Sequence, residues 1–288
     1  MDLGYFTAGI TYTPPLGAGP QTDLELGAAD ANGIWWRLRS WTGMGGPATS
    51  GQVVQRGGDH GTWATPQWYA ERLITLTVEA CAPSQALRDV ARATLQQAIP
   101  VSDLATLRWD EPVPVQMAVR RTGEIPEAYP TLNDVVFSVV LVAPDPRKYS
   151  TVLHSLTATQ ASAAVGLAPP LTPPFTLPAG APPMAVACTN AGSFETRPTV
   201  TITGPITGPA VVNQTTGQAV SFPGMTLAAT DVLTVDFTAR QAYLNGVFRT
   251  ADVSSSWWVL PPGTTTVQVT GTGATGSTMT VAWRDAWI

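Results

Sequence analysis

The chain has 288 residues, of which 44% are hydrophobic and only 12% are charged. This length predicts two domains of ordinary size, and the composition excludes a disordered, highly charged chain. The net charge of −5 excludes a general attraction to nucleic acid or to an anionic membrane surface.

Cysteine and histidine are too few to form a zinc site by sequence spacing. The chain contains only Cys81, Cys188, His60 and His154, with no C-x-x-C pair. One long-range disulfide and two buried thiols both fit this pattern. The first ten residues have no basic stretch, so we expect no signal peptide. No apolar run approaches the ~20 residues that span a bilayer, so we expect no membrane insertion.

The first half predicts a mainly β domain over residues 1–149. Short apolar runs alternate with turn residues, and we expect strands at 34–41, 73–78, 113–119 and 135–142. One amphipathic helix is predicted over 85–99, because apolar residues recur there at helical spacing. Ser84 is its expected N-cap, and Pro100 ends it.

The second half, residues 150–288, predicts a β-sandwich. Alternating patterns give strands near 199–203, 232–237, 266–270 and 279–284, and Asn245-Gly246 is typical of a hairpin turn. No helical pattern interrupts them, which favours a sandwich. Residues 167–184 are rich in proline and predict extended chain, which would serve either as a linker or as a strap across a neighbour.

The sequence shows no catalytic, cofactor or metal motif. It has no P-loop, G-x-G-x-x-G, G-x-S-x-G or H-E-x-x-H. Asp59-His60 lies in a glycine-rich turn, where polar side chains usually cap backbone groups. The acidic pairs Asp110-Glu111 and Asp231/Asp236 are spaced so that their members point to opposite faces of a strand. We therefore expect no enzyme, no cofactor and no bound metal.

The tryptophans indicate packing surfaces. Two adjacent pairs occur, Trp35-Trp36 and Trp257-Trp258, and neighbours on a strand point to opposite faces. One ring of each pair can enter a core, and the other needs a second surface, which could lie within the chain, on another subunit or on a sugar. Tryptophan and arginine are enriched at interface anchors. The candidate interface residues are Trp35, Trp36, Arg37, Arg39, Trp41, Trp257 and Trp258.

An ordered series of motifs resembles the distal tail proteins of long-tailed, non-contractile bacteriophages (siphoviruses). In the first half the series is Gly57-Gly58-Asp59-His60-Gly61, then Tyr69, Arg72 and Ile74-Thr75-Leu76, then 143–149. In the second half it continues with Asn190-Ala191-Gly192, 197–204, 231–236, Asn245-Gly246 and Leu260-Pro261-Pro262-Gly263.

The resemblance implies a structural role. Members of this family form a hexameric ring through the amino-terminal domain, which joins the tail tube to the tail-tip or baseplate hub proteins and lets DNA pass through its lumen. The carboxy-terminal domain would be a galectin-like β-sandwich that docks other tail proteins. Implied partners are copies of the chain itself, the tail tube protein, the tape-measure protein and the tail-tip hub protein. The implied location is the distal end of the virion tail, after synthesis in the host cytoplasm.

Two other functions remain open at this stage. A carbohydrate-binding receptor protein would present an aromatic platform near Trp257 or Trp258. A cell-wall hydrolase would use Asp59 or His60.

Overall fold

The computed structural model of the chain describes residues 7–15, 21–160 and 184–288. These residues divide into an amino-terminal domain, which runs to Thr151 and includes Ile288, and a carboxy-terminal domain, Val152–Trp287. The boundary expected from the sequence lies after residue 149, close to this position. Of the proline-rich segment predicted over 167–184, only Met184 lies within the described residues, where it begins a strand.

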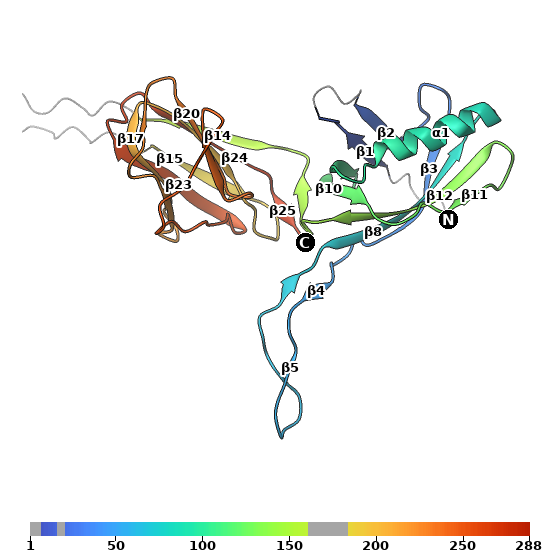
Figure 1. Cartoon of the computed structure of the whole chain (residues 1–288), viewed down its shortest axis with the longest axis horizontal. Helices are drawn as coiled ribbons and strands as arrows, with labels where there is room; N and C mark the ends of the chain where they lie inside the picture. Colours follow the sequence, from blue (N-terminus) through green and yellow to red (C-terminus); the bar gives the residue numbers. More distant parts are fainter. Residues whose placement is uncertain (1–6, 16–20, 161–183) are drawn as a thin grey trace, which may run out of the picture. The chain divides into compact units, whose positions relative to one another are not determined.

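The amino-terminal domain contains one antiparallel main sheet, a small hairpin extension and one helix (Figure 1). Its elements are β1 (Ala8–Tyr12), β2 (Thr22–Leu26), β3 (Trp35–Thr42), β4 (Thr49–Ser50), β5 (Val54–Gln55), β6 (Thr62–Trp63), β7 (Trp68–Tyr69), β8 (Arg72–Cys81), α1 (Gln85–Ala98), β9 (Ala105–Trp109), β10 (Val115–Arg121), β11 (Glu127–Ala128), β12 (Asp134–Ala143) and β13 (Lys148–Ser150).

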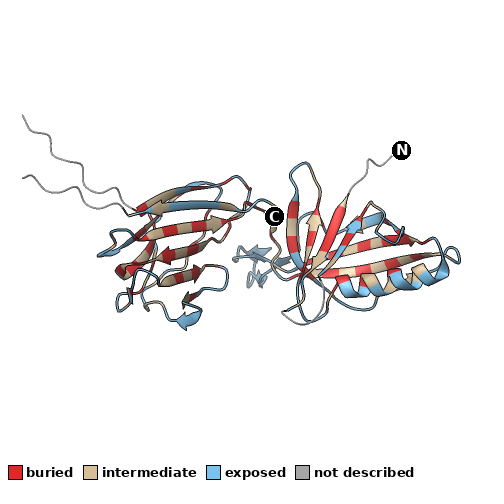
Figure 2. Ribbon diagram, turned by 90° about the horizontal axis from the view of Figure 1, so that it is seen from above, coloured by how far each residue is buried: buried red, intermediate tan, exposed pale blue. Residues whose placement is uncertain are grey.

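The main sheet follows the order β2-β1-β9-β10-β12-β8-β3, with β11 paired to β12 and β13 paired to β10. Its centre is the β12–β8 pair, which stays in register over the full length of both strands. Residues alternate between buried and half-buried along β12, because successive side chains point to opposite faces (Figure 2). One face of the sheet therefore forms the core.

Helix α1 covers the core where it packs against β1, β2 and β8. The hydroxyl oxygen of Ser84 accepts a hydrogen bond from the Leu87 amide at 3.3 Å, which satisfies one free donor of the first turn. Ala91, Leu95 and Ala98 form the buried stripe of the helix. The helix predicted over 85–99 is confirmed. No helix in the described ranges is long and apolar enough to cross a membrane.

The carboxy-terminal domain consists of β strands, which except for β25 lie in two sheets (Figure 1). Its elements are β14 (His154–Thr159), β15 (Met184–Asn190), β16 (Thr199–Thr203), β17 (Ile206–Asn213), β18 (Ala219–Ser221), β19 (Thr226–Leu227), β20 (Val232–Asp236), β21 (Gln241–Leu244), β22 (Val247–Arg249), β23 (Gly263–Thr272), β24 (Thr278–Trp283) and β25 (Ala286–Trp287).

The two sheets enclose one apolar core, so the predicted sandwich is confirmed. One sheet runs β14-β24-β16-β20-β21-β22, and the other runs β15-β23-β17-β18 with β19 paired to β17. Both contribute to the core, for example Val200 and Val281 from the first and Val211 and Val267 from the second. The hairpin predicted at Asn245-Gly246 joins β21 to β22, with φ of 50° and 80° at the two turn residues.

Both cysteines are free thiols. Of the two alternatives that the sequence leaves open, one disulfide or two thiols, the structure therefore has the two thiols. Cys188 is fully buried in the sandwich core, and Cys81 is half-buried in β8.

The Cys188 thiol should make the carboxy-terminal domain less stable at high pH. Burial raises its pKa from 9.0 to about 12. Between these pH values only the unfolded chain releases the proton, so the stability that the neutral thiol contributes below pH 9 is lost as pH rises toward 12. Urea unfolding of the wild type and of Cys188→Ala should differ by about 2 kcal/mol less at pH 10.5 than at pH 7.5. An unchanged difference would show that the thiol titrates normally.

Candidate interaction surfaces

Strand β3 forms one edge of the main sheet and carries most of the interface residues predicted from the sequence. Trp36 points into the core and is 1% exposed, and its indole nitrogen donates to Oδ2 of Asp30 at 3.4 Å. Trp35 lies on the other face, opposite Cys81 in the register, and is 38% exposed. Within this pair only Trp35 is exposed, so Trp36 is a core residue.

The two arginines of β3 have different surroundings. Arg39 lies at a bulge, where the register with β8 shifts between Leu38 and Ser40. Its guanidinium donates to both carboxylate oxygens of Glu79, at 2.9 and 2.5 Å, and so pairs a carboxylate that is almost fully buried. Arg37 is exposed, directly opposite Glu79 in the register. Arg39 is exposed as well, so the two arginines differ in that, of the two, only Arg39 forms an ion pair with a described residue.

The bulge also decides the position of Trp41. Without it, Trp35, Arg37 and Trp41 would share one face of the strand. The shift instead places Trp41 opposite Leu76, on the core side, where its ring meets Trp109 edge-on at a centroid distance of 5.2 Å. Trp41 is thus half-buried within its own domain.

The second tryptophan pair lies in the chain that leads to β23, outside any strand. Trp258 is 3% exposed and packs against Phe237 with ring centroids 4.2 Å apart. Trp257 is half-buried and meets the same ring edge-on at 5.4 Å. Only Trp257 reaches the surface, so an aromatic platform at Trp258 is excluded in this structure.

A long hairpin of residues 43–71, which we call the arm, projects from the main sheet between β3 and β8 (Figure 1). Two short antiparallel ladders, β4–β7 and β5–β6, hold its two sides together. All four strands of the arm are exposed along their whole length. Its large exposed hydrophobic residues are Val53, Val54, Trp63, Trp68 and Tyr69. The arm therefore holds apolar side chains in water that its own domain does not cover.

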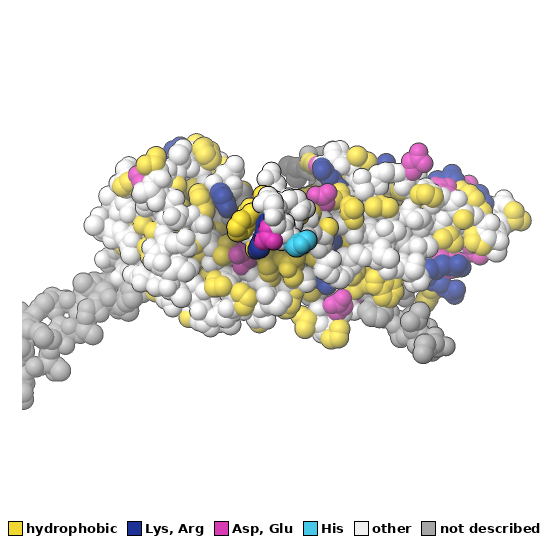
Figure 3. Space-filling model, turned by 90° about the horizontal axis from the view of Figure 1, so that it is seen from below, with side chains coloured by type: hydrophobic (Ala, Val, Ile, Leu, Met, Phe, Trp, Pro, Cys, Tyr) yellow, Lys and Arg dark blue, Asp and Glu magenta, His cyan; other side chains and the backbone are white. Residues whose placement is uncertain are grey.

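The tip of the arm is the glycine-rich turn predicted over 57–61. Gly58 and Gly61 have φ of 77° and 87°, in the left-handed region that glycine favours. Arg56 lies 5.0 Å from the centroid of Trp63 and 3.8 Å from a carboxylate oxygen of Asp59. Figure 3 looks at the tip end-on and shows charged side chains and a histidine beside apolar ones. These are exposed contacts, with no buried acid–base pair.

The base of the arm is fixed by a buried arginine. Arg72 is 1% exposed, and burial lowers its pKa. Its Nε donates to the carbonyl of Pro146 at 3.0 Å, and its Nη1 donates to the carbonyls of Gly43, at 2.9 Å, and Gly45. These bonds tie the outgoing side of the arm to the start of β8 and to the 144–147 loop. The arm therefore leaves the sheet from a rigid base.

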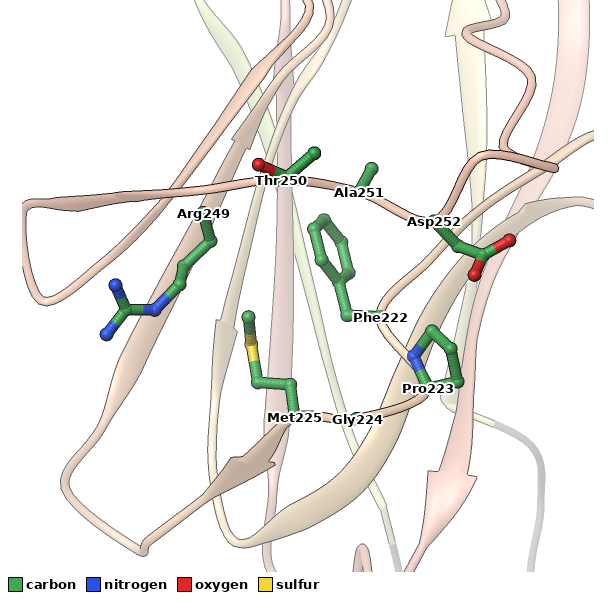
Figure 4. Close-up of a pocket in the computed structure, with 8 residues that line it drawn as sticks. All are labelled: Phe222, Pro223, Gly224, Met225, Arg249, Thr250, Ala251 and Asp252. Atoms are coloured by element: carbon green, nitrogen blue, oxygen red, sulfur yellow. The ribbon is translucent and has the colours of Figure 1, made fainter.

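The carboxy-terminal domain has two adjoining surface hollows, on the two sides of residues 249–252. One, of about 340 Å³, is bounded by 222–225, and Figure 4 shows Phe222 and Met225 pointing into it. The other, of about 250 Å³, is bounded by β21 and Trp257. Arg240 lines the second hollow, and Arg249 lines both. The site thus combines apolar walls with two cations.

The titratable residues considered from the sequence serve local structure. His154 pairs with Asp285 at 3.1 Å and stacks on Trp283 with centroids 5.4 Å apart. Asp110 accepts hydrogen bonds from Arg108 and from the Thr7 hydroxyl. In the part of the chain that the structure describes, no three metal-ligating side chains gather.

Asp231, Asp236 and Asp59 accept hydrogen bonds from backbone amides close to them in the sequence. Asp231 accepts from the Ala228 amide and from the Asn245 side chain, and Asp236 accepts from the Thr238 amide at 2.7 Å. Asp59 accepts from the His60 amide at 2.7 Å. Asp231 and Asp236 thus have separate hydrogen-bond partners at the two ends of β20.

Residues 191–287 match the family described as "Siphovirus-type tail component, C-terminal domain". The fold is similar to the crystal structure of the SPP1 phage Dit protein (gp 19.1), described as a paradigm of hub adsorption apparatus in phages that infect Gram-positive bacteria. The TM-score is 0.61 at 14% identity, over 88% of this chain and 94% of that one.

Two structures of the activated phage P2 baseplate are also similar. For the calcium form the TM-score is 0.53 at 10% identity, over 96% of this chain and 97% of the matched chain. For the strontium form the TM-score is 0.52 at 10% identity, over 97% of this chain and 98% of the matched chain. No curated protein sequence matches the chain. Together with the family match, this fold confirms the resemblance predicted from the ordered motifs.

Proposed function

We propose that this chain, a distal tail protein of the siphovirus type by its carboxy-terminal family match and its fold, forms a hexameric ring at the end of a phage tail. The ring would join the tail tube to the tail-tip or baseplate hub proteins and leave a lumen for DNA, with the tape-measure protein as a further neighbour. The role is structural, with no bond made or broken.

The arm carries this proposal. A lone subunit leaves Trp63, Trp68 and Val53 each at least 60% exposed on a hairpin with a fixed base. Burying such surface is favourable by about 25 cal/mol per Å², and exposed apolar surfaces of this kind mark protein contacts. In a head-to-tail ring each subunit presents one surface and receives a different one from its neighbour, so an arm that reaches outward suits closure into a ring.

Two further features of the chain support a ring, namely the edge strand β3 and the negative net charge. Strand β3 lies at an edge of the main sheet, and residues 27–29 pair with its first two residues. Beyond them no strand among the described residues covers the edge, where unpaired backbone groups need a cover. The net charge of −5 suits a lumen through which DNA passes without being held.

Ring formation is tested with variants of the arm. In Trp63→Ser/Trp68→Ser the arm loses its two most exposed rings, and we expect the oligomer to dissociate at least tenfold more readily than the wild type, because each buried indole contributes several kcal/mol to an interface. The measurement is the mass distribution at micromolar concentration, with negative-stain imaging of rings, alone and with the tail tube protein.

The matched control is Val253→Ser, a fully exposed residue of the other domain. It should leave the ring unchanged. A wild type that stays monomeric even with the tube protein present would contradict the proposal, and so would arm variants that assemble as well as the control.

A further inference from the structure

We propose that the two hollows beside residues 249–252 form a docking site for an extended, acidic segment of a neighbouring tail protein, with apolar side chains seated in the hollows. This rests on the proposed function, since it names a contact through which the carboxy-terminal domain would bind a partner. We call this surface the 249–252 site.

The first observation is two cations without a counter-ion. Arg240 and Arg249 line the same hollow, and neither forms an ion pair with any described residue. Among the described residues Arg249 donates only to the carbonyl of Phe248, at 3.2 Å. Arg240 is exposed with φ of 55°, a backbone conformation that few residues other than glycine adopt. Two arginines presented in this way suit the carboxylates of a partner.

The acid at the site does not neutralise them. Asp252 accepts hydrogen bonds from the hydroxyl and the amide of Ser254, at 2.5 and 2.9 Å, which hold its pKa below the ordinary value. Figure 4 shows the Asp252 carboxylate and the Arg249 guanidinium at opposite ends of the hollow, pointing away from each other. The cationic end is therefore free to receive a negative group.

The second observation is apolar surface at the same place. Phe222 and Met225 wall one hollow, and Trp257 borders the other. Phe248 and Val247 on β22 are 53% and 55% exposed. An acidic ligand that also carries aliphatic or aromatic side chains would cover both kinds of surface, whereas a free anion would use only the arginines.

The third observation favours a polypeptide over a sugar. Strand β22 is the last strand of its sheet, so one side of its backbone faces no strand among the described residues. Its two-residue turn makes Leu244 and Val247 a hydrogen-bonded pair, and the amide and carbonyl of Phe248 therefore point away from β21. The carbonyl accepts from Arg249, which leaves the amide of Phe248 for a partner strand. An extended peptide can add to such an edge through its own backbone, which a sugar cannot do.

The site is tested with peptides. Fluorescently labelled, overlapping peptides that cover the tail-tip proteins of the same phage are titrated against the full chain by fluorescence polarisation. We expect at least one peptide with several acids and an apolar residue to bind. Arg249→Gln or Arg240→Gln should weaken this binding about tenfold, because a charge-assisted hydrogen bond is lost. Replacing the acids of the peptide by their amides should have a similar effect.

The matched control is Arg197→Gln, which removes the same charge elsewhere in the domain. The proposal is overturned if no peptide binds, or if Arg197→Gln weakens peptide binding as much as Arg249→Gln does. It is also overturned if host cell-wall polysaccharide displaces the peptide and the binding of that polysaccharide is lost in Arg249→Gln. Thermal unfolding of each variant shows whether it is folded. If an arginine variant does not fold, Phe248→Ser replaces it as the test variant, and we expect it to weaken peptide binding.

The same samples separate this inference from the proposed function. Ring mass is measured for the wild type and for Arg249→Gln, which should assemble equally. Rings without peptide binding reject only the 249–252 site. Peptide binding by a chain that never forms rings rejects the ring.

Discussion

Replacing Trp36 by alanine is expected to lower the free energy of unfolding of the amino-terminal domain by about 3–5 kcal/mol. The indole is almost fully buried, so its loss removes a large apolar contact and leaves a cavity between β3 and the core. The indole nitrogen also donates to Asp30, whose carboxylate accepts from the amides of Asn32 and Ile34 in the turn before β3. The variant therefore loosens an edge strand together with the turn that precedes it.

The neighbouring residue provides the control. Trp35 has the same side chain one position earlier on the same strand but lies on the opposite, exposed face. Trp35→Ala should cost less than about 1 kcal/mol. Urea unfolding followed by circular dichroism measures both variants in the full chain. Equal losses for the two variants would contradict the assignment of faces. If the Trp35→Ala variant folds normally but assembles into fewer hexamers, the Trp35 indole lies in the contact between subunits.

The strands and the helix were predictable because their signals are local. Alternation of apolar and polar residues needs only the two-residue period of a strand, and it located β8, β12, β16 and β24. The helix needed only its cap and its apolar spacing. The division of Trp35-Trp36 into one core ring and one outer ring follows from the same alternation, since adjacent residues on a strand point in opposite directions. Trp257 and Trp258 lie outside any strand and both contact Phe237, so alternation does not account for their difference in burial.

The bulge on β3 was not predictable from the strand pattern. Nothing in Leu38-Arg39-Ser40 announces that one residue drops out of the register with β8. A single shift of this kind moves every later side chain to the other face, which is why Trp41 lies inside while Trp35 lies outside. Predicting which aromatic residues face a partner therefore requires the pairing of two strands that are far apart in sequence.

The arm and the 249–252 site were missed for related reasons. The ladders of the arm are two residues long, too short for any period, and its glycines are typical of a loop. The hollows are formed by segments that meet only in the folded sandwich, 222–225 and 249–252. Arg72 would be expected at the surface, because arginine is rarely fully buried, and its burial depends on carbonyls from the outgoing side of the arm and from the 144–147 loop.

Gly43→Ala is expected to destabilise the amino-terminal domain by about 2–4 kcal/mol and to displace the arm. Gly43 follows β3 at the base of the arm with φ of 89°, where residues with a side chain are strained. A Cβ at this position would also overlap the backbone carbonyl of Leu73, and the backbone of a paired strand cannot move aside as a side chain can. Any shift that relieves the overlap also moves the Gly43 carbonyl, to which Arg72 donates.

Gly46→Ala is the control, because a Cβ there would meet nothing within 4 Å and the backbone is not in the left-handed region. Chemical unfolding should separate the two variants, and hydrogen exchange at 68–72 should be faster in Gly43→Ala alone. If both variants unfold like the wild type, the base of the arm is not rigid. A rigid base matters for assembly because an arm fixed in direction loses less conformational freedom when a neighbouring subunit receives it, so Gly43→Ala should also weaken the ring although it removes no apolar side chain.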